Sequence, residues 1–524
     1  MQQPGDQAAQ PRSERVTTPR TARNVLLAWA AFAFTVVVNF FLSPFIVHTL
    51  GNTEYGVWVL LASLVGYMGL LDLGVRGAVS RYIARHHARV EDEEAGRVAS
   101  AGLAIFSAAG LVALAASVVI ALALEHLFKI PPGTLLVARI VVVLGGLNVA
   151  VSLVSGVFGG AVTAMQRFDL DAVVGIGIGA LRAVALLAAL SAGGGLLALA
   201  LVQLGCTLLQ TLVYFVLTAR LYPELRYRLR GLDGAELRKI FSFSVYSSLL
   251  HFSAALIYSA DALVIGAFLP VASVTYFAIA STLTDYTRSI IGAISRTMTP
   301  RASALDGLGA RQELEQVLLK AGAVSSLVTL PITITFILRG GAFIGLWMGP
   351  GYAATSGRIL VILAVALSLA AGRQVVASTV IGVNRHREMV PFYIAEALIN
   401  VGLSVYWIRS LGLVGVALGT TVPNLVTTLL VTPWMVRRVM GTPLRTIWRE
   451  MWLRPIAAMV PFAAATWAVE HRWPAHGLAS FFAGVVLTLP VAAAGAWLVA
   501  LTADERRALR SALRRLPPFA ASRA

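Results

Sequence analysis

Charged residues are scarce in this sequence: Asp, Glu, Lys and Arg make up 13% of its 524 residues, whereas a soluble domain carries roughly 25%. The mean hydropathy is correspondingly high, at +0.79. Apolar runs of about 20 to 30 residues recur from Asn24 to Leu501 and leave no room for a separate soluble domain. The composition therefore excludes an ordinary soluble protein and predicts a chain that crosses a membrane many times.

Cysteine and the common catalytic motifs are also nearly absent. The one cysteine, Cys206, lies within an apolar run, so neither an intrachain disulfide nor a cysteine-based metal site can form. The sequence contains no GxxxxGK[ST] phosphate loop, no HExxH zinc motif and no nucleophile elbow. We therefore expect a transporter and not an enzyme, with no cofactor, no metal and no catalytic residue.

The apolar runs predict an all-α polytopic membrane protein. We count about fourteen runs of spanning length. They cover residues 24–48, 55–75, 97–124, 134–164, 170–192, 195–219, 238–268, 271–299, 314–338, 358–382, 389–409, 411–436, 451–470 and 477–501.

The basic residues between these runs predict the orientation. Lys and Arg are retained on the cytoplasmic side during insertion, and about 33 of the 42 fall on one side of the predicted spans. Both termini of this multi-pass protein are then expected to be cytoplasmic. Three arginines, Arg182, Arg288 and Arg373, lie inside the spans, so this rule does not explain them.

The chain also shows a weak internal repeat at an offset of about 220 residues. The segment "LGNTEYGVWVLLASLVGY" from Leu50 resembles "LPVASVTYFAIASTLTDY" from Leu269. Six helices per repeat give two lobes of equal orientation. The expected organisation is a basic tail (1–23), an N-lobe (24–222), a cytoplasmic linker (223–237), a C-lobe (238–440), two further helices (441–501) and a second basic tail (502–524).

Three passages resemble one known family. They are "LGNTEYGVWVLLASLVGYMGLLDLGVRGAVSRYIA" from Leu50, "MQRFDLDAVV" from Met165 and "YSADALVIGAFLPVASVTYFAIAS" from Tyr258. In this order they are similar to the polysaccharide transport, or Wzx-type oligosaccharide, flippases of the multidrug/oligosaccharidyl-lipid/polysaccharide exporter superfamily. The resemblance implies a flippase that moves undecaprenyl-pyrophosphate-linked oligosaccharide from the cytoplasmic to the periplasmic leaflet during surface polysaccharide (lipopolysaccharide O-antigen) synthesis.

A flippase needs a polar cavity, because a charged head group cannot cross hydrocarbon unpaired. Polar residues at helical spacing, and charges within spans, are the candidates for lining it. The candidates for substrate binding are Arg182, Arg288, Arg373, Asp285, Glu396, Asp261, His251 and Asn400. Polar stripes also pack helices together, and Asp285 with Arg288 also fits a self-neutralising structural pair.

The expected partners follow from this interpretation. They are a lipid-linked oligosaccharide, membrane lipids and, in the same pathway, a polysaccharide polymerase and glycosyltransferases. The net charge of +17 does not indicate a nucleic-acid partner, because the basic residues lie between apolar runs and not on a polar fold. Export of a pyrophosphate with roughly two negative charges is downhill, at about 2.3 kcal/mol per charge for 100 mV. We expect alternating access without ATP, with Arg182, Arg288 and Arg373 contacting the pyrophosphate.

Three other functions stay open at this point. A drug/cation antiporter of the same superfamily would be expected to hold a carboxylate in the first span, and 25–50 contains none. A peptidoglycan-precursor flippase is also similar, because it too has about fourteen helices and an arginine-lined cavity. A membrane polymerase, ligase or glycosyltransferase usually has a large exoplasmic loop, whereas the longest exoplasmic segment predicted here is 339–357.

Overall fold

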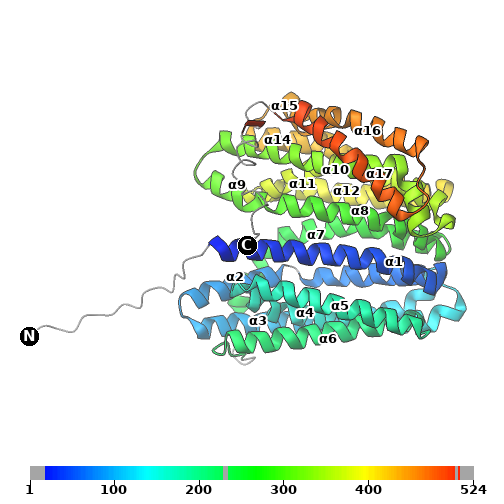
Figure 1. Ribbon diagram of the computed structural model, residues 1–524. Helices are drawn as coiled ribbons and strands as arrows, with labels where there is room; N and C mark the ends of the chain where they lie inside the picture. Colours follow the sequence, from blue (N-terminus) through cyan, green and yellow to red (C-terminus); the bar gives the residue numbers. More distant parts are fainter. Residues whose placement is uncertain (1–17, 73, 228–233, 502–505, 508–524) are drawn as a thin grey trace, which may run out of the picture. The chain divides into compact units, whose positions relative to one another are not determined.

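The computed structural model describes residues 18–72, 74–227, 234–501 and 506–507, and within these ranges every regular element is helical (Figure 1). Residues 1–17 of the first basic tail lie outside the described residues, as do 228–233 of the predicted linker and most of the tail 502–524. The expected all-α membrane fold is confirmed.

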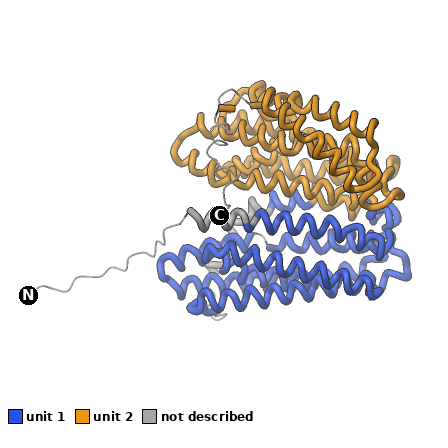
Figure 2. Tube along the Cα trace, viewed as in Figure 1, with its two compact units in different colours: residues 1–255, 265–275 blue, residues 256–264, 276–524 orange. Residues whose placement is uncertain are grey.

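The described chain divides into two compact units, which are coloured separately in Figure 2. Unit 1 comprises residues 1–255 and 265–275, and unit 2 comprises residues 256–264 and 276–524. Each unit is described below by itself.

Unit 1 is built from the first six long helices and parts of the seventh. Its elements are α1 (Thr18–Met68), the short η1 (Gly69–Asp72), α2 (Val75–Ala88), α3 (Asp92–Leu127), α4 (Pro132–Ala164), α5 (Phe168–Ser191) and α6 (Gly195–Leu221). The seventh helix, α7 (Gly234–Phe268), contributes residues to both units.

Two predicted spans lie in α1, which is broken at Gly51. The backbone there has φ +73° and ψ 172°, which is far from helical. A positive φ of this size is costly for any residue with a Cβ, so glycine is the residue that allows the break. The chain can therefore reverse from the span 24–48 to the span 55–75 with almost no loop.

Small residues bring α3 and α4 together in unit 1. A Cβ atom placed on Gly146 would lie 2.2 Å from Ser117 Oγ, and one on Gly110 would lie 2.9 Å from Ala150 Cβ. Close approach of this kind is the usual way that helices associate in lipid, where apolar burial gives little driving force. Phe106 and Leu153 are buried in the core that these helices form with α2.

Unit 2 holds the remaining helices. They are α8 (Ala272–Arg296, of which 276–296 belong to this unit), α9 (Met298–Gly307), α10 (Arg311–Trp347), α11 (Pro350–Gly382), η2 (His386–Glu388), α12 (Val390–Leu411), α13 (Leu413–Val426), α14 (Thr432–Met440), α15 (Leu444–Trp448), α16 (Arg454–Arg472) and α17 (Leu478–Gly495). Three π-helical segments join or extend these helices: η3 (Thr427–Val431), η4 (Arg449–Leu453) and η5 (Ala496–Ala500).

Twelve helical segments among the described residues are long and apolar enough to cross a membrane. The predicted number was about fourteen. The difference has two sources: the stretch Trp29–Ala88 counts once although it contains two predicted spans, and α8 is absent from the twelve. The multi-span architecture is confirmed, and the count of about fourteen stays a prediction.

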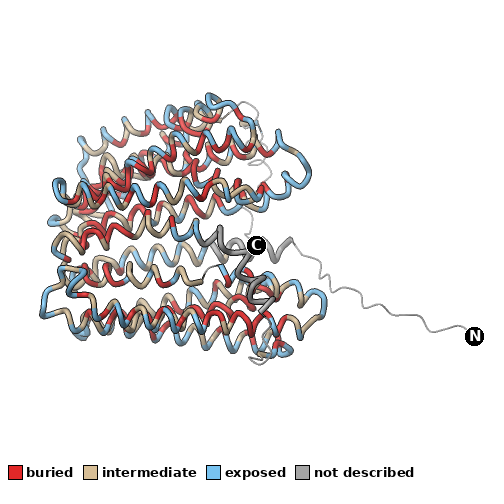
Figure 3. Tube along the Cα trace, turned by 180° about the vertical axis from the view of Figure 1, so that it is seen from behind, coloured by how far each residue is buried: buried red, intermediate tan, exposed pale blue. Residues whose placement is uncertain are grey.

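The outward faces of these helices are apolar, as expected for contact with lipid. Large apolar side chains such as Leu111, Leu122 and Leu498 are 67–69% exposed. Figure 3 shows exposed and buried positions alternating along the helices in this manner. Such surfaces suit hydrocarbon, where the helical hydrogen bonds already satisfy the backbone.

The predicted segment 339–357 between two spans is helical except at Met348 and Gly349. The helix α10 continues to Trp347 and α11 begins at Pro350. Its glycines serve as packing points between the two helices. A Cβ on Gly340 would lie 2.9 Å from Leu360 Cδ2, and one on Gly357 would lie 2.8 Å from Gly341 Cα. The two helices therefore pack closely where a loop was expected.

Candidate functional site

Most of the predicted site residues gather in unit 2, on four of its helices. Asp261 lies on α7, Asp285 and Arg288 lie on α8, and Arg373 lies on α11. Glu396 and Asn400 lie on α12, and the adjoining α13 supplies Thr420 and Asn424, which the sequence interpretation did not single out. Residues separated by almost 170 positions thus form one polar cluster inside apolar helices.

The centre of this cluster is an ion pair between Arg373 and Glu396. Arg373 Nη1 donates to Glu396 Oε1 at 2.8 Å, and Nη2 donates to Oε2 at 2.6 Å. Their side chains are only 6% and 1% exposed. A bidentate, charge-assisted pair is the geometry in which two buried charges best compensate each other.

Two further side chains complete the coordination of this pair. Arg373 Nε donates to the Tyr393 hydroxyl at 3.4 Å, and the guanidinium Cζ lies 4.6 Å from the centre of the Tyr393 ring. Asn424 Nδ2 donates to Glu396 Oε1 at 3.3 Å. Tyr393 and Glu396 are three residues apart on α12, so one helix face presents both to Arg373.

A second pair, Asp285 with Arg288, lies on α8. Arg288 Nη1 donates to Asp285 Oδ1 at 2.6 Å across one helical turn. The Arg288 guanidinium also lies over the Tyr258 ring, 4.1 Å from its centre. The side chains are less buried than the first pair, 26% exposed for Arg288 and 59% for Asp285. The self-neutralising pair expected from their spacing is present.

Asp261 and Asn400 are buried and each makes a specific hydrogen bond. The Thr420 hydroxyl donates to Asp261 Oδ1 at 2.9 Å. Asn400 Nδ2 donates to the carbonyl oxygen of Ile257 at 3.2 Å, so it ties α12 to α7. Asp261 is 5% exposed and Asn400 is fully buried. A carboxyl group at this depth with one hydroxyl donor is an expensive feature for purely structural use.

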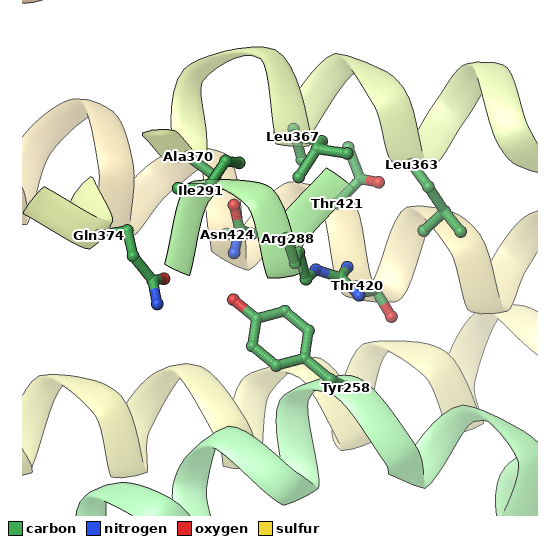
Figure 4. A pocket seen from close by; sticks show the side chains of 11 residues that line it. Tyr258, Arg288, Ile291, Leu363, Leu367, Ala370, Gln374, Thr420, Thr421 and Asn424 are labelled. Carbon is green, nitrogen blue, oxygen red and sulfur yellow. The ribbon is translucent and has the colours of Figure 1, made fainter. Parts of the chain in front are cut away.

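A pocket opens beside these pairs (Figure 4). In this conformation its enclosed space is about 20 Å³, room for about one water molecule, within about 420 Å³ of open and enclosed space together. The polar side chains that line it are Tyr258, Arg288, Gln374, Thr420, Thr421 and Asn424. The rest of the lining is aliphatic, from α8 and α11. An apolar wall with a few convergent polar groups is typical of small-molecule sites.

Arg182 and His251 do not belong to this cluster. Both lie in unit 1, Arg182 on α5 and His251 on an exposed part of α7. Arg182 Nε is buried and has no hydrogen-bond partner. Gly179, one turn earlier on the same helix, faces Phe34 of α1. Arg182 is thus an arginine within a span whose hydrogen-bonding capacity is not fully used.

One buried ion pair was missed by the sequence interpretation. Arg339, predicted to lie in the exoplasmic segment, is inside α10 and 1% exposed, and its Nε donates to Glu470 Oε2 of α16 at 2.5 Å. Its guanidinium also lies 4.5 Å from the centre of the Phe481 ring of α17. Arg339 follows directly after the predicted span 314–338, so it was assigned to the exoplasmic side, and its pairing with a residue 131 positions away has no local signal in the sequence.

Two tyrosines at the end of α6 have altered acidity. The Tyr222 hydroxyl donates to Asp92 Oδ1 of α3. Burial, with this hydrogen bond, raises the pKa of Tyr222 well above its ordinary value. Burial raises the pKa of Tyr227 to about 12. Both phenols therefore stay neutral at physiological pH. The Tyr222 hydrogen bond ties the end of α6 to α3, whereas the Tyr227 ring packs against the Phe158 ring of α4, with 5.7 Å between the ring centres.

No cluster of three or more His, Cys, Asp or Glu side chains that could hold a metal ion occurs among the described residues. The polar side chains of the unit 2 cluster take part in hydrogen bonds and ion pairs.

Comparison with known proteins decides the family. The family model of polysaccharide biosynthesis proteins matches residues 46–356, more than half of the chain. The chain belongs to this family. The resemblance found in the sequence is confirmed, and the polysaccharide biosynthesis protein described here is a multi-pass membrane protein.

Relatives of this polysaccharide biosynthesis protein are distant in sequence. It is 20% identical to the uncharacterised membrane protein EpsK of Bacillus subtilis strain 168 over 443 residues, 84% of this chain and 86% of EpsK. Its fold is similar to that of the lipid II flippase MurJ in an inward closed conformation (TM-score 0.70, 12% identity, 91% of this chain and 98% of MurJ). It is also similar to an inward-facing multidrug resistance MATE family transporter of the MOP superfamily (TM-score 0.65, 17% identity, 78% and 95%).

Proposed function

We propose that this polysaccharide biosynthesis protein is a flippase for an isoprenoid-pyrophosphate-linked oligosaccharide, which it moves from the cytoplasmic to the periplasmic leaflet of the inner membrane by alternating access. The observation that carries the proposal is a buried polar cluster with a pocket inside the apolar helices of unit 2, in a chain that belongs to a polysaccharide biosynthesis family. A polar head group needs such an environment to cross hydrocarbon.

The fold supports a transporter. The two solved structures described above are a flippase and a multidrug transporter. MurJ is described as acting on lipid II, and we propose a lipid-linked substrate for the present chain as well. The fold alone is shared at this level of identity, so the class of substrate rests on the family match and on the site.

The ion pairs change which arginine is the best candidate for the pyrophosphate. Arg373 forms a bidentate ion pair with Glu396. Arg288 forms an ion pair with Asp285 and a cation–π contact with Tyr258. Withdrawing Arg373 toward a substrate would leave a buried carboxylate unpaired, which is strongly unfavourable. Arg182, whose Nε is buried without a partner, is therefore the arginine that we propose to contact the pyrophosphate.

The membrane potential supplies a driving force for this export. A pyrophosphate carries roughly two negative charges, and each gains about 2.3 kcal/mol on moving outward through 100 mV. With the cell interior negative, translocation is therefore downhill by several kcal/mol, without nucleotide hydrolysis.

The test in cells uses a strain that lacks the gene. We expect that strain to accumulate lipid-linked oligosaccharide in the cytoplasmic leaflet and to lose surface polysaccharide, and the wild-type gene to restore both. Arg182→Ala at normal expression should restore neither, whereas Arg220→Ala, an exposed arginine at the end of α6, should restore both. A deletion strain with no accumulated lipid-linked sugar would overturn the proposal.

A further inference from the structure

The pocket of unit 2 is lined by groups that suit a sugar better than a phosphate. Its neutral polar lining consists of two amides, Gln374 and Asn424, and three hydroxyl groups, from Tyr258, Thr420 and Thr421. Its one cation, Arg288, is held by Asp285 at 2.6 Å. Amides and hydroxyls both donate and accept hydrogen bonds, as the hydroxyl groups of a sugar require.

The arginines around the pocket are paired with carboxylates, so no unpaired positive charge is left to bind an anion. Arg373 pairs with Glu396, and Arg288 pairs with Asp285. The remaining carboxyl group, Asp261, receives only the Thr420 hydroxyl among the hydrogen bonds described. A pyrophosphate placed here would meet three carboxyl groups and two arginines that are already paired, and like charges at close range repel. A neutral ligand meets no such penalty.

Asn424 gives the pocket a hydrogen-bond acceptor that has no partner in the structure. Its Nδ2 faces Glu396 Oε1, because an ionised carboxylate only accepts hydrogen bonds, and this fixes the orientation of the amide. Its Oδ1 is buried without a partner, and the residue is 4% exposed. A buried acceptor that is left unsatisfied costs stability unless a ligand or water satisfies it.

Two of the other neutral groups, Gln374 and Tyr258, are at least partly exposed, whereas Thr420 and Thr421 are buried. Gln374 is exposed, and the Tyr258 ring is held from one face by the Arg288 guanidinium. Figure 4 shows the Tyr258 hydroxyl pointing away from its own helix, toward the helices that carry Gln374 and Asn424. Three neutral groups from α7, α11 and α13 thus line one pocket.

We propose that this pocket, which widens as the helices move during alternating access, recognises a neutral, hydroxyl-bearing sugar of the substrate, through Asn424 Oδ1, the Gln374 amide and the Tyr258 hydroxyl, and that it does not hold the pyrophosphate. The inference rests on the proposed function, because it assigns the glycan part of the same lipid-linked substrate to unit 2.

The test measures binding to the purified full chain in lipid nanodiscs. The probes are undecaprenyl pyrophosphate and the same lipid carrying N-acetylglucosamine, N-acetylgalactosamine, glucose or galactose. We expect at least one sugar-bearing probe to bind more tightly than the bare lipid. Asn424→Leu should abolish this gain, and Tyr258→Phe should reduce it by about three- to tenfold, the usual value of one hydrogen bond. Both variants should bind the bare lipid as the wild type does.

The matched control is Tyr406→Phe, which removes a hydroxyl from a side chain that is 73% exposed on α12 and should change neither affinity. Tyr258→Phe keeps the ring beneath Arg288, so it tests the hydroxyl without disturbing the ion pairs. An equal loss of affinity for bare and sugar-bearing lipid in Asn424→Leu and Tyr258→Phe would overturn the inference, and so would a wild type to which no sugar adds affinity.

The two proposals fail in different ways. If the bare lipid binds and Arg182→Ala weakens its binding, but no sugar adds affinity, only the sugar pocket is excluded. If neither bare nor sugar-bearing lipid binds the wild type, the proposed flippase function fails and the inference with it.

Discussion

Removing one member of the Arg373–Glu396 pair should destabilise the protein more than removing both. The two charges are 6% and 1% exposed and are joined by two short hydrogen bonds. Arg373→Met leaves a buried carboxylate with only the Asn424 amide, and Glu396→Met leaves a buried guanidinium beside Tyr393. Breaking a buried pair in this way costs about 3–5 kcal/mol.

The double variant Arg373→Met/Glu396→Met buries no charge, so much of this loss should be recovered. Replacing a whole buried pair by apolar side chains of similar volume is often neutral or better. The difference between the double variant and the two single variants is the coupling energy of the pair, and residues in direct contact usually show about 0.5–3 kcal/mol.

The assay is thermal unfolding of the purified protein in detergent, followed by tryptophan fluorescence. For a unit of this size, about 1 kcal/mol shifts Tm by roughly 2–4 °C. Each single variant should therefore lower Tm by roughly 6–20 °C. Arg437→Met, at an exposed position near the end of α14, is the control and should stay within about 2 °C of the wild type. Single variants with an unchanged Tm, or a double variant that loses the full sum of both, would refute the buried pairing.

Three further changes test the packing and the charges of unit 2. Gly419→Ala should lower Tm by several degrees, because its Cβ would lie 2.3 Å from Ser404 Oγ. Its control, Gly402→Ala, meets no atom within 4 Å and should be neutral or stabilising. Equal Tm values for the two variants would contradict the close contact of α12 and α13. Arg339→Met should lower Tm by roughly 6–20 °C, because it leaves Glu470 without its partner, and Tm of Arg339→Met/Glu470→Gln should recover part of the loss. Asp261→Asn should keep or raise Tm by a few degrees, since it removes a buried charge at nearly constant volume; a large fall would show that the ionised carboxylate is needed.

The helices could be predicted because the membrane imposes a local rule. The predicted span 195–219 corresponds to α6 (Gly195–Leu221), and 170–192 corresponds to α5 (Phe168–Ser191). Any stretch of chain in hydrocarbon must satisfy its own backbone hydrogen bonds, so hydropathy alone locates such helices. Hydropathy also predicted a break between spans at 339–357. The glycines of α10 and α11 pack these two helices together there, and the segment is mostly helical.

The members of the site could be predicted more easily than their partners. The period of α12 placed Glu396 and Asn400 on one face, and both are buried. That Arg373 pairs with Glu396 and not with a substrate depends on how α11 meets α12, which no local pattern encodes. The pairing of Asp285 with Arg288 could be predicted from the sequence, because side chains three residues apart on one helix lie close together.

The most direct test of the central claim is translocation by the purified full chain in liposomes. The liposomes contain a fluorescent undecaprenyl-pyrophosphate-linked oligosaccharide, and a reductant that cannot cross the membrane quenches only the outer leaflet. We predict that the wild-type protein makes the inner pool accessible to the reductant. A membrane potential that is negative inside the liposomes should speed this process. Arg182→Ala should slow it, whereas Arg220→Ala should not. If the inner pool stays protected from the reductant in the presence of the wild-type protein, at either sign of the potential, the protein is not a flippase for this lipid.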